Sequence, residues 1–202
     1  MKSKNKLYKI LILLGVICIF CAVLLLVKNE QIELNAQSYN ESAVEQIKQE
    51  IENSQEEIVE DFYEIPSEEF SYEELPTETT IENETYIGVL YFYSLDLELA
   101  VQSDWSYEKL SNTPCVYQEE PFSIAGHNYT SHFGKISNLE IDDLVLFTDM
   151  SGEEFVFTVV SNTIVNETNI EALEDATYDL TLFTCNYYNN SERILIRLNL
   201  LD

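Results

Sequence analysis

The first part of the chain contains one long apolar run. Residues 7–27 read LYKILILLGVICIFCAVLLLV, with Lys9 as the single charge. A helix of this length spans about 30 Å, the thickness of a bilayer hydrocarbon core. The run predicts a transmembrane helix over 7–27 after a short N-terminus of residues 1–6. A cleaved signal peptide is the alternative, but the run is longer than a usual signal core and no small-residue cleavage site follows Val27.

Residues 28–85 are polar and acidic. Val44, Ile47, Ile51, Ile58 and Phe62 recur at helical spacing, which predicts one amphipathic helix around 42–62. After Tyr63 the pattern dissolves into a Glu-rich stretch that contains two prolines and is typical of a linker. We therefore interpret 28–85 as an acidic extracellular stalk.

From residue 86 onward the pattern changes to short β-rich runs separated by polar connections. Short helical turns are expected near 105–110 and 170–175. Runs of this number and spacing predict an all-β domain over 86–202, either a closed barrel or a sandwich. The expected strands are 86–93, 98–102, 115–118, 122–127, 143–149, 154–165, 178–185 and 193–200.

The net charge of the chain excludes one class of binding partner. Ten Lys and Arg stand against 37 Asp and Glu, a formal net charge of −27. Such a surface cannot neutralise a row of phosphates, which argues against nucleic acid. Lys2, Lys4, Lys6 and Lys9 precede or open the apolar run. Positive charge resists translocation, so we expect a single-pass protein of the cell membrane with a cytoplasmic N-terminus and an extracellular β-domain.

The β-domain offers few residues for chemistry. Cys185 ends one expected strand and Arg193 opens the next. An antiparallel hairpin would place these two residues opposite each other, whereas Arg197 would lie roughly 13 Å further along its strand. We therefore expect Arg193 to be the partner of Cys185, and Arg197 to form an ion pair in this acidic domain.

A thiol, an imidazole and a guanidinium together suit acyl transfer. An imidazole can take the thiol proton and return it to a leaving amine, and a guanidinium can stabilise an oxyanion. The residues alone leave His127 and His132 as equal candidates for the base. Phosphate binding and metal chelation fit less well, because the sequence has no Gly-rich loop and no His and Cys at ligand spacing.

Three segments resemble the signature motifs of the sortase family. They are SIAGHN (123–128), TLFTC (181–185) and ERILIRL (192–198), in the family's order of His, Cys and Arg. The WSYEKLSNTPCVY block is similar to clostridial-type members, and the class stays open among class D, A-like and B-like sortases. The resemblance implies an eight-stranded sortase-type β-barrel, all-β with short helices, behind an N-terminal membrane anchor.

The resemblance also implies roles for residues. Cys185 would be the nucleophile, His127 the general acid/base, Arg193 the oxyanion or substrate-orienting group and Thr184 a substrate-positioning residue. His132 would then be a loop histidine. Cys115 would be structural and not a disulfide partner of Cys185, which must stay a free thiol.

The implied reaction is the cleavage of an LPXTG-like sorting signal near the C-terminus of secreted proteins, followed by transfer to an amine of the peptidoglycan precursor in a Gram-positive cell wall. We expect no cofactor and no metal. Some family members use calcium, and Glu167, Glu171, Glu174 and Asp175 could bind it, although a solvated acidic loop is the favoured interpretation.

Two alternatives remain open from the sequence. The first is an extracellular cysteine protease, in which water resolves the thioester. The second is a non-catalytic surface binding module carried on a stalk. An occluding lid over the site, formed by Asp61, Phe62 and Tyr63, is a further hypothesis.

Overall fold

The structure is a computed structural model that describes residues 2–58 and 78–201. It divides into two compact units, residues 1–35 and residues 36–202. The first unit consists of the beginning of helix α1 (Lys2–Ile58). Every side chain from Tyr8 to Ile32 is exposed, and the helix is long and apolar enough to cross a membrane. These are the properties expected of the anchor predicted over 7–27.

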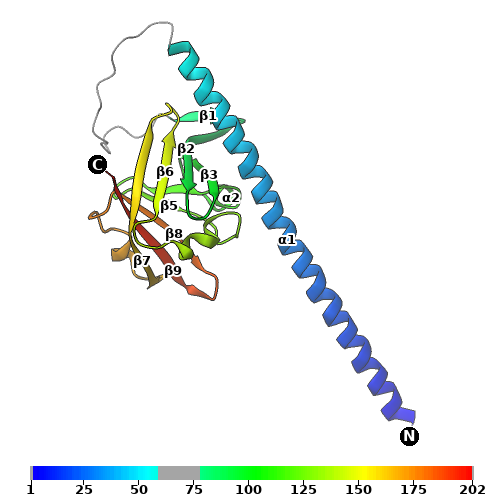
Figure 1. Ribbon diagram of the computed structural model, residues 1–202. Helices are drawn as coiled ribbons and strands as arrows, with labels where there is room; N and C mark the ends of the chain where they lie inside the picture. Colours follow the sequence, from blue (N-terminus) through cyan, green and yellow to red (C-terminus); the bar gives the residue numbers. More distant parts are fainter. Residues whose placement is uncertain (1, 59–77, 202) are drawn as a thin grey trace. The chain divides into compact units, whose positions relative to one another are not determined.

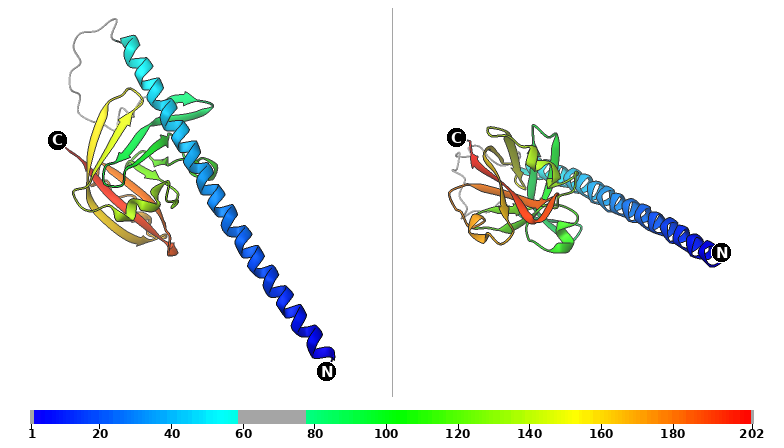
Figure 2. Two further views of the ribbon diagram at one scale, coloured as in Figure 1. Left: turned by 45° about the vertical axis from the view of Figure 1, so that its right-hand side comes forward. Right: turned by 90° about the horizontal axis from the view of Figure 1, so that it is seen from below.

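The second unit is built around a β-barrel (Figures 1 and 2). The strand order is β1-β2-β3-β4-β5-β8-β9-β7-β6, and an additional pairing of β2 with β6 closes the sheet. Strands β2 to β9 therefore form the predicted eight-stranded barrel, and β1 is an extra strand paired with β2. The strands are β1 (Thr79–Ile81), β2 (Glu84–Phe92), β3 (Leu97–Gln102), β4 (Cys115–Gln118), β5 (Ser123–Ala125), β6 (Leu144–Asp149), β7 (Glu154–Asn166), β8 (Leu180–Asn186) and β9 (Asn189–Leu200).

Side chains alternate between the inside and the outside of the barrel, as the two-residue period of a strand requires. On β9, Ile194, Ile196 and Leu198 belong to the main core cluster with Leu180 and Leu182 of β8. The residues between them point to the outer face. The main core is apolar and continuous, which leaves polar chemistry to the outer face and the ends of the strands.

The second half of α1 packs on the outside of the barrel. Ala43, Val44, Ile47 and Ile51 form a buried cluster with four residues of the barrel unit, Tyr86, Val89, Ala100 and Met150. The spacing of three and four residues between the helical positions creates one apolar stripe. Val44, Ile47 and Ile51 are three of the five residues on which the sequence prediction of a helix over 42–62 rested.

Asn40 of α1 completes the edge of β3. Its side-chain nitrogen donates to the Glu98 carbonyl at 2.9 Å, and its oxygen accepts from the Ala100 N–H at 3.0 Å. β3 pairs with β4 only at Gln102 and Cys115, so this stretch of β3 has no neighbouring strand on that side. The amide of Asn40 thus takes the place of a strand, and Lys48 adds an ion pair to Glu98 at 2.7 Å.

These contacts correct the expected stalk. Within the expected stalk, residues 28–58 are all helical, so the helix does not begin at residue 42 as predicted but is already present at residue 28. Residues 36–51 of this helix belong to the barrel unit. The packing of this helix on the barrel could not be predicted from the sequence, because the apolar stripe binds an outer barrel surface that forms only in the tertiary fold. Residues 59–77, including the end of the predicted helix and the proposed lid of Asp61, Phe62 and Tyr63, lie outside the described residues.

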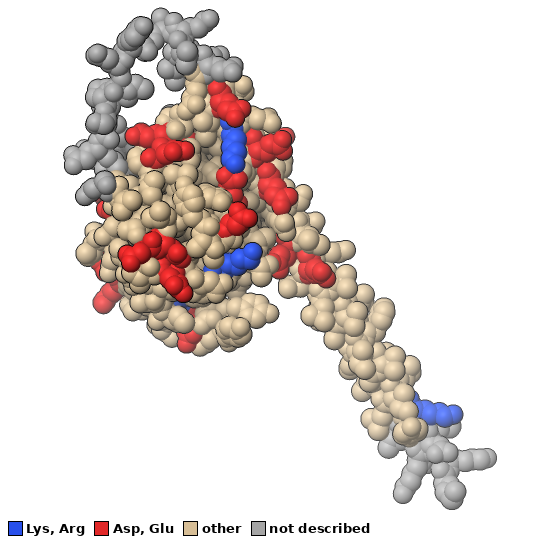
Figure 3. Space-filling view, in the orientation of Figure 1, with Lys and Arg blue, Asp and Glu red and all other residues tan. Residues whose placement is uncertain are grey.

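The other elements agree with the predicted pattern within a few residues. All eight expected strands are present, and short helices occur at Tyr107–Leu110 (α2) and Ile170–Ala172 (η2). The sequence analysis did not anticipate β1 or the 3-10 helix η1 (Phe133–Asn138). Figure 3 shows acidic side chains spread over the visible face of the barrel, with few basic side chains among them.

Candidate active site

The candidate site lies at one end of three neighbouring strands. β5 and β8 are parallel, and β8 and β9 are antiparallel, so the ends of β5 and β8 meet the beginning of β9 (Figure 1). Cys185 and Arg193 are direct cross-strand partners, as predicted for the hairpin. Opposite residues of an antiparallel pair point to the same face of the sheet, with Cβ atoms about 4.5–5.5 Å apart. The thiol and the guanidinium therefore leave the sheet on one side.

His127 reaches the same end from β5. Ala125 pairs with Phe183, and the Gly126 N–H donates to the Phe183 carbonyl at 3.0 Å, which continues the parallel register. One residue further, His127 is level with the end of β8, where Cys185 lies. Neighbouring strands are about 4.8 Å apart. The register thus places His127, two residues beyond the end of β5, close to the paired Cys185 of β8 and Arg193 of β9.

Gly126 is required by the packing behind His127. A Cβ atom at this position would lie 2.3 Å from Cδ2 of Phe133, a fully buried side chain. The Phe133 N–H also donates to the His127 carbonyl at 3.0 Å. The glycine lets η1 pack directly against the strand end, and this packing fixes the backbone that carries the imidazole.

The two histidines differ in accessibility. His127 is half-buried, and its ring stacks on Tyr129 with centroids 4.5 Å apart. His132 is fully buried at the start of η1. Burial lowers the pKa of His127, because desolvation disfavours the imidazolium. This burial favours the neutral imidazole, the form that accepts a proton, whereas a substrate cannot reach the fully buried His132.

The two cysteines of the barrel also differ. Cys185 is a free thiol that is partly exposed, while Cys115 is completely buried. The Cys115 thiol donates to the Thr113 carbonyl at 3.4 Å, and burial raises its pKa to about 12. Both are free cysteines in the structure. Of the two, Cys185 has the accessibility that a nucleophile needs.

Arg193 is held by three acceptors. Its Nη1 donates to the carbonyls of Asn190 at 2.8 Å and Glu192 at 3.0 Å, and its Nη2 pairs with Glu167 Oε2 at 3.2 Å. The sequence did not connect Glu167 with Arg193. The two come together because β7 pairs with β9, with Val165 opposite Arg193 and Glu167 two residues further along the chain.

Thr184 faces away from the thiol. It is a cross-strand partner of Ile194, whose side chain lies in the main core, and it is buried. Because neighbouring residues of a strand point to opposite faces, Thr184 lies on the inner side and Cys185 on the outer side. Its role in positioning substrate stays a prediction, and the outer face offers other residues for contact.

An apolar floor continues from Cys185 along the outer face. It consists of Ala125, Phe183 and Leu195, with Phe183 and Leu195 forming the cross-strand pair next to Cys185 and Arg193. Leu110, Val165, Ala172 and Leu173 pack against this floor. The sequence analysis did not identify it, although counting back two residues from Cys185 gives Phe183. The three floor residues are buried beneath these four side chains, so a peptide beside the thiol would meet the covering side chains and not the floor itself.

Arg197 holds the loop that follows β7. It is buried, donates to Thr181 Oγ1 at 2.6 Å and to the Ala172 carbonyl, and lies 5.2 Å from the centroid of the Tyr178 ring. These described contacts with a hydroxyl, a carbonyl and a ring replace the ion pair that the sequence led us to expect. Burial lowers the pKa of the guanidinium, against the opposing effect of the Asp175 charge. Arg197 thus ties residues 172–178 to the floor.

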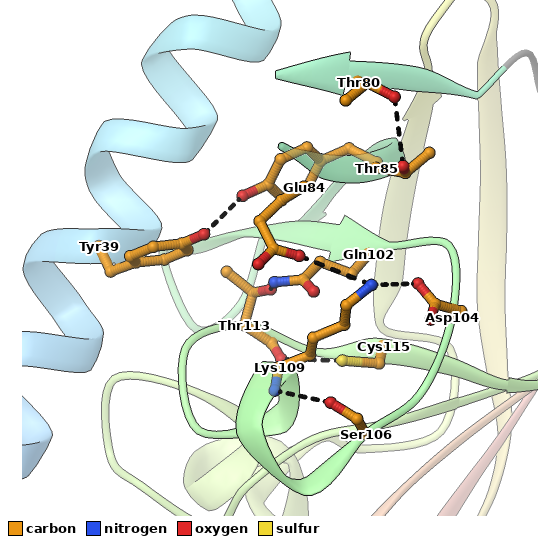
Figure 4. A network of polar contacts seen from close by, with 11 residues as sticks. Tyr39, Thr80, Glu84, Thr85, Gln102, Asp104, Ser106, Lys109, Thr113 and Cys115 are labelled. Atoms are coloured by element: carbon orange, nitrogen blue, oxygen red, sulfur yellow. Dashed lines mark hydrogen bonds and ion pairs between the residues drawn. The ribbon is translucent and has the colours of Figure 1, made fainter. Parts of the chain in front are cut away.

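Helix α2, which carries Leu110, is fixed by a polar network (Figure 4). Ser106 caps the helix by accepting from the Lys109 N–H at 3.1 Å. The Lys109 amine lies between Asp104 and Glu84, with the Glu84 oxygen 3.6 Å away, and the hydrogen bond to Asp104 raises its pKa. This network positions Leu110 against the apolar floor.

The acidic residues considered for calcium do not converge. Glu167 pairs with Arg193, and the Asp175 carboxylate accepts from the backbone and side chain of Thr177, which lowers its pKa. Within residues 2–58 and 78–201, no group of three or more His, Cys, Asp or Glu is placed to hold a metal ion.

Comparison with known proteins places this geometry in a family. A sortase domain model matches residues 93–201. The Streptococcus suis sortase C1 structure is 19% identical, covers 58% of this chain and 73% of its own, and superimposes with a TM-score of 0.53. Listeria monocytogenes sortase A is 21% identical over 58% of this chain and 88% of its own, with a TM-score of 0.53. Clostridium perfringens sortase C is 18% identical over 80% of this chain and 90% of its own, with a TM-score of 0.52.

No curated protein sequence is a match for the chain. The structural similarities support the barrel fold, and the domain model covers more than half of the residues. Together with the closed barrel, this match shows that the chain belongs to the sortase family, the sortase-type transpeptidases.

Proposed function

We propose that the protein cleaves an LPXTG-like sorting signal of secreted proteins and transfers them to an amine of the peptidoglycan precursor. Cys185 is the nucleophile, His127 the general acid/base and Arg193 the oxyanion donor in this proposal. The observation that carries it is the position of the three residues at one end of β5, β8 and β9.

The first half-reaction forms a thioester. His127 takes the proton of the Cys185 thiol, and the sulfur attacks the Thr carbonyl carbon of the signal. The negative charge that develops on the carbonyl oxygen is stabilised by Arg193; losing such a donor typically costs about 2.7–4 kcal/mol in the transition state. The C–N bond then breaks, and the Gly amine leaves with the proton from His127.

The second half-reaction restores the thiol. The amine of the precursor attacks the thioester carbon and gives a proton to His127. The C–S bond breaks and the sulfur takes that proton back. Each proton passes through His127, which exchanges it with the Cys185 sulfur on one side and with a substrate amine on the other.

The length of β8 is compatible with an extended substrate. Thr181 and Cys185 lie on the same face of β8, four residues or about 13 Å apart. Four extended residues of a peptide cover about the same length. A cavity of about 450 Å³ near the start of β8, lined by Glu120, Pro121, Ala176 and Tyr178, offers room upstream of the signal.

The proposal places the enzyme in the cell membrane through residues 7–27, with a cytoplasmic N-terminus and an extracellular barrel. Anchoring confines the enzyme and a lipid-linked amine to one thin layer, which raises their effective concentration.

Covalent trapping tests the proposal. The full-length protein in detergent micelles is incubated with sorting-signal peptides, and the modified residue is mapped by mass spectrometry. We expect a thioacyl adduct on Cys185 that Cys185→Ala abolishes. Cys115→Ala is the matched control, because Cys115 is buried, and it should leave the adduct unchanged.

Addition of a primary amine separates transfer from hydrolysis. A peptide–amine conjugate as the main product supports the transpeptidase. Release of the free acid alone, at any amine concentration, would favour a cysteine protease. A complete lack of adduct with a broad peptide panel would favour a non-catalytic binding module.

A further inference from the structure

The guanidinium of Arg193 is partly exposed and lies on β9 opposite the end of β8, where a long side chain has many rotamers to choose from. Three acceptors limit that choice: the carbonyls of Asn190 and Glu192 and the carboxylate of Glu167. The two carbonyls come from the same strand and engage Nη1 alone. Glu167 is the contact from another element, and it engages Nη2.

The backbone of Glu167 is itself fixed. β7 pairs with β9 through Val165 and Arg193 and through Asn166 and Glu192. The Glu167 N–H then donates to the Ser191 carbonyl at 2.8 Å, one residue beyond the strand. The carboxylate is therefore delivered to the guanidinium from a defined position.

This ion pair is partly exposed, with 25% of the Arg193 side chain and 44% of the Glu167 side chain accessible. Exposed pairs of this kind add little to folding stability. The orientation of an oxyanion donor, in contrast, strongly affects a transition state. The contacts described above use Nη1 and Nη2 and do not involve Nε. They therefore fix the orientation of the guanidinium plane relative to the substrate.

We propose that Glu167 is a positioning residue that holds Arg193 for oxyanion stabilisation at Cys185. This inference rests on the proposed function, because it assigns Glu167 a part in the same site. Glu167 acts through Arg193 and does not touch the substrate.

The first experiment measures kcat and KM of transpeptidation for the full-length protein. Glu167→Gln removes the charge but keeps the shape, and we expect a loss of about 10- to 100-fold in kcat with KM nearly unchanged. Glu167→Asp should recover part of the loss. Glu171→Gln is the matched control, since Glu171 is an exposed acid in the same loop and its substitution should leave kcat unchanged.

A double-mutant cycle shows whether the effect passes through Arg193. In the Arg193→Gln background, Glu167→Gln should cause no further loss of kcat. Equal losses in both backgrounds, or an equal loss from Glu171→Gln, would overturn the inference.

A second readout does not need a substrate. Arg193 attracts anions to Cys185, so we compare the rates at which iodoacetate and neutral iodoacetamide alkylate this thiol, mapped by peptide mass. Loss of the Glu167 charge by itself raises the ratio of the iodoacetate rate to the iodoacetamide rate, and the Arg193→Gln background measures this effect. Relative to that background, Glu167→Gln should lower the ratio at least twofold when Arg193 is present. Identical changes in the two backgrounds would contradict positioning. The absence of any thioacyl adduct in the wild-type protein would contradict the proposed function instead, and the alkylation cycle would still report on Glu167.

Discussion

At the scale of single residues, the environment of His127 matters most for the chemistry. A neutral imidazole is the form that accepts a proton, and partial burial favours this form by lowering the pKa. The surroundings of Cys115 act in the opposite sense on a thiol, since burial keeps that sulfur protonated. The fold thus separates a usable base from an inert thiol by desolvation alone.

The pH dependence of acylation follows from the His127 environment. The base form exists above the pKa of His127, and that pKa lies below the ordinary value of 6.5. The midpoint of the acid limb of kcat/KM for acylation should therefore lie below pH 6.5. A pH–rate profile of the full-length protein with a sorting-signal peptide measures this.

His127→Asn provides the control for that profile. It should remove most of the acylation rate and, with it, the acid limb, while the thermal unfolding midpoint changes little because His127 is only half-buried. An acid limb centred above pH 7 in the wild-type protein would show that another group, or a charged imidazole, governs the step.

At the scale of elements, the second half of α1 belongs to the barrel unit. It covers Tyr86, Val89 and Ala100 on the outer face and supplies hydrogen bonds to the open edge of β3. An uncovered strand edge exposes unpaired backbone groups to other chains. The helix therefore contributes both to the stability of the barrel and to its protection from edge-to-edge association.

Substitution of Asn40 tests this contribution. Asn40→Ala leaves the Ala100 N–H and the Glu98 carbonyl without their partner in a buried place, which should cost about 1–3 kcal/mol of unfolding free energy. We expect the thermal midpoint to fall by about 2–10 °C. Near-ultraviolet circular dichroism of the full-length protein follows the loss of barrel packing.

The matched control is Gln37→Ala on the same helix. Gln37 is exposed and bonds only to Glu41 within α1 among its described contacts. Its substitution should change the midpoint by no more than a degree or two. Equal effects of the two substitutions would mean that Asn40 contributes helix propensity and not the closure of the β3 edge.

At the scale of the whole molecule, local patterns were enough to predict the strands and the hairpin that sets Cys185 opposite Arg193. Seven residues separate the two in the sequence, so pairing within one hairpin brings them together. The placement of His127 needed more, because β5 and β8 are parallel and distant in sequence. Only the resemblance to a known family connected them in advance.

What the sequence could not predict depends on surfaces that the fold assembles. The docking of α1 needs an outer barrel face made from β2 and β3, and the apolar floor needs β5, β8 and β9 together. Glu167 and Arg197 gain their contacts from neighbouring strands and loops. The sequence led us to expect solvated charges in the loop that contains Glu167 and an ion pair for Arg197. In the structure Glu167 pairs with Arg193, and Arg197 contacts a hydroxyl, a carbonyl and a ring.

The parallel pairing of β5 with β8 also separates the reactive groups along the chain. A contiguous fragment must extend at least from His127 to Arg193 to contain all three. A break in the exposed turn at Ile141 and Asp142 would leave the imidazole on one polypeptide and the sulfur and guanidinium on the other. Two such halves, each silent alone, should regain peptide cleavage on mixing only where they reassemble. The fold is therefore suited to a split reporter of association between fused proteins at a cell surface.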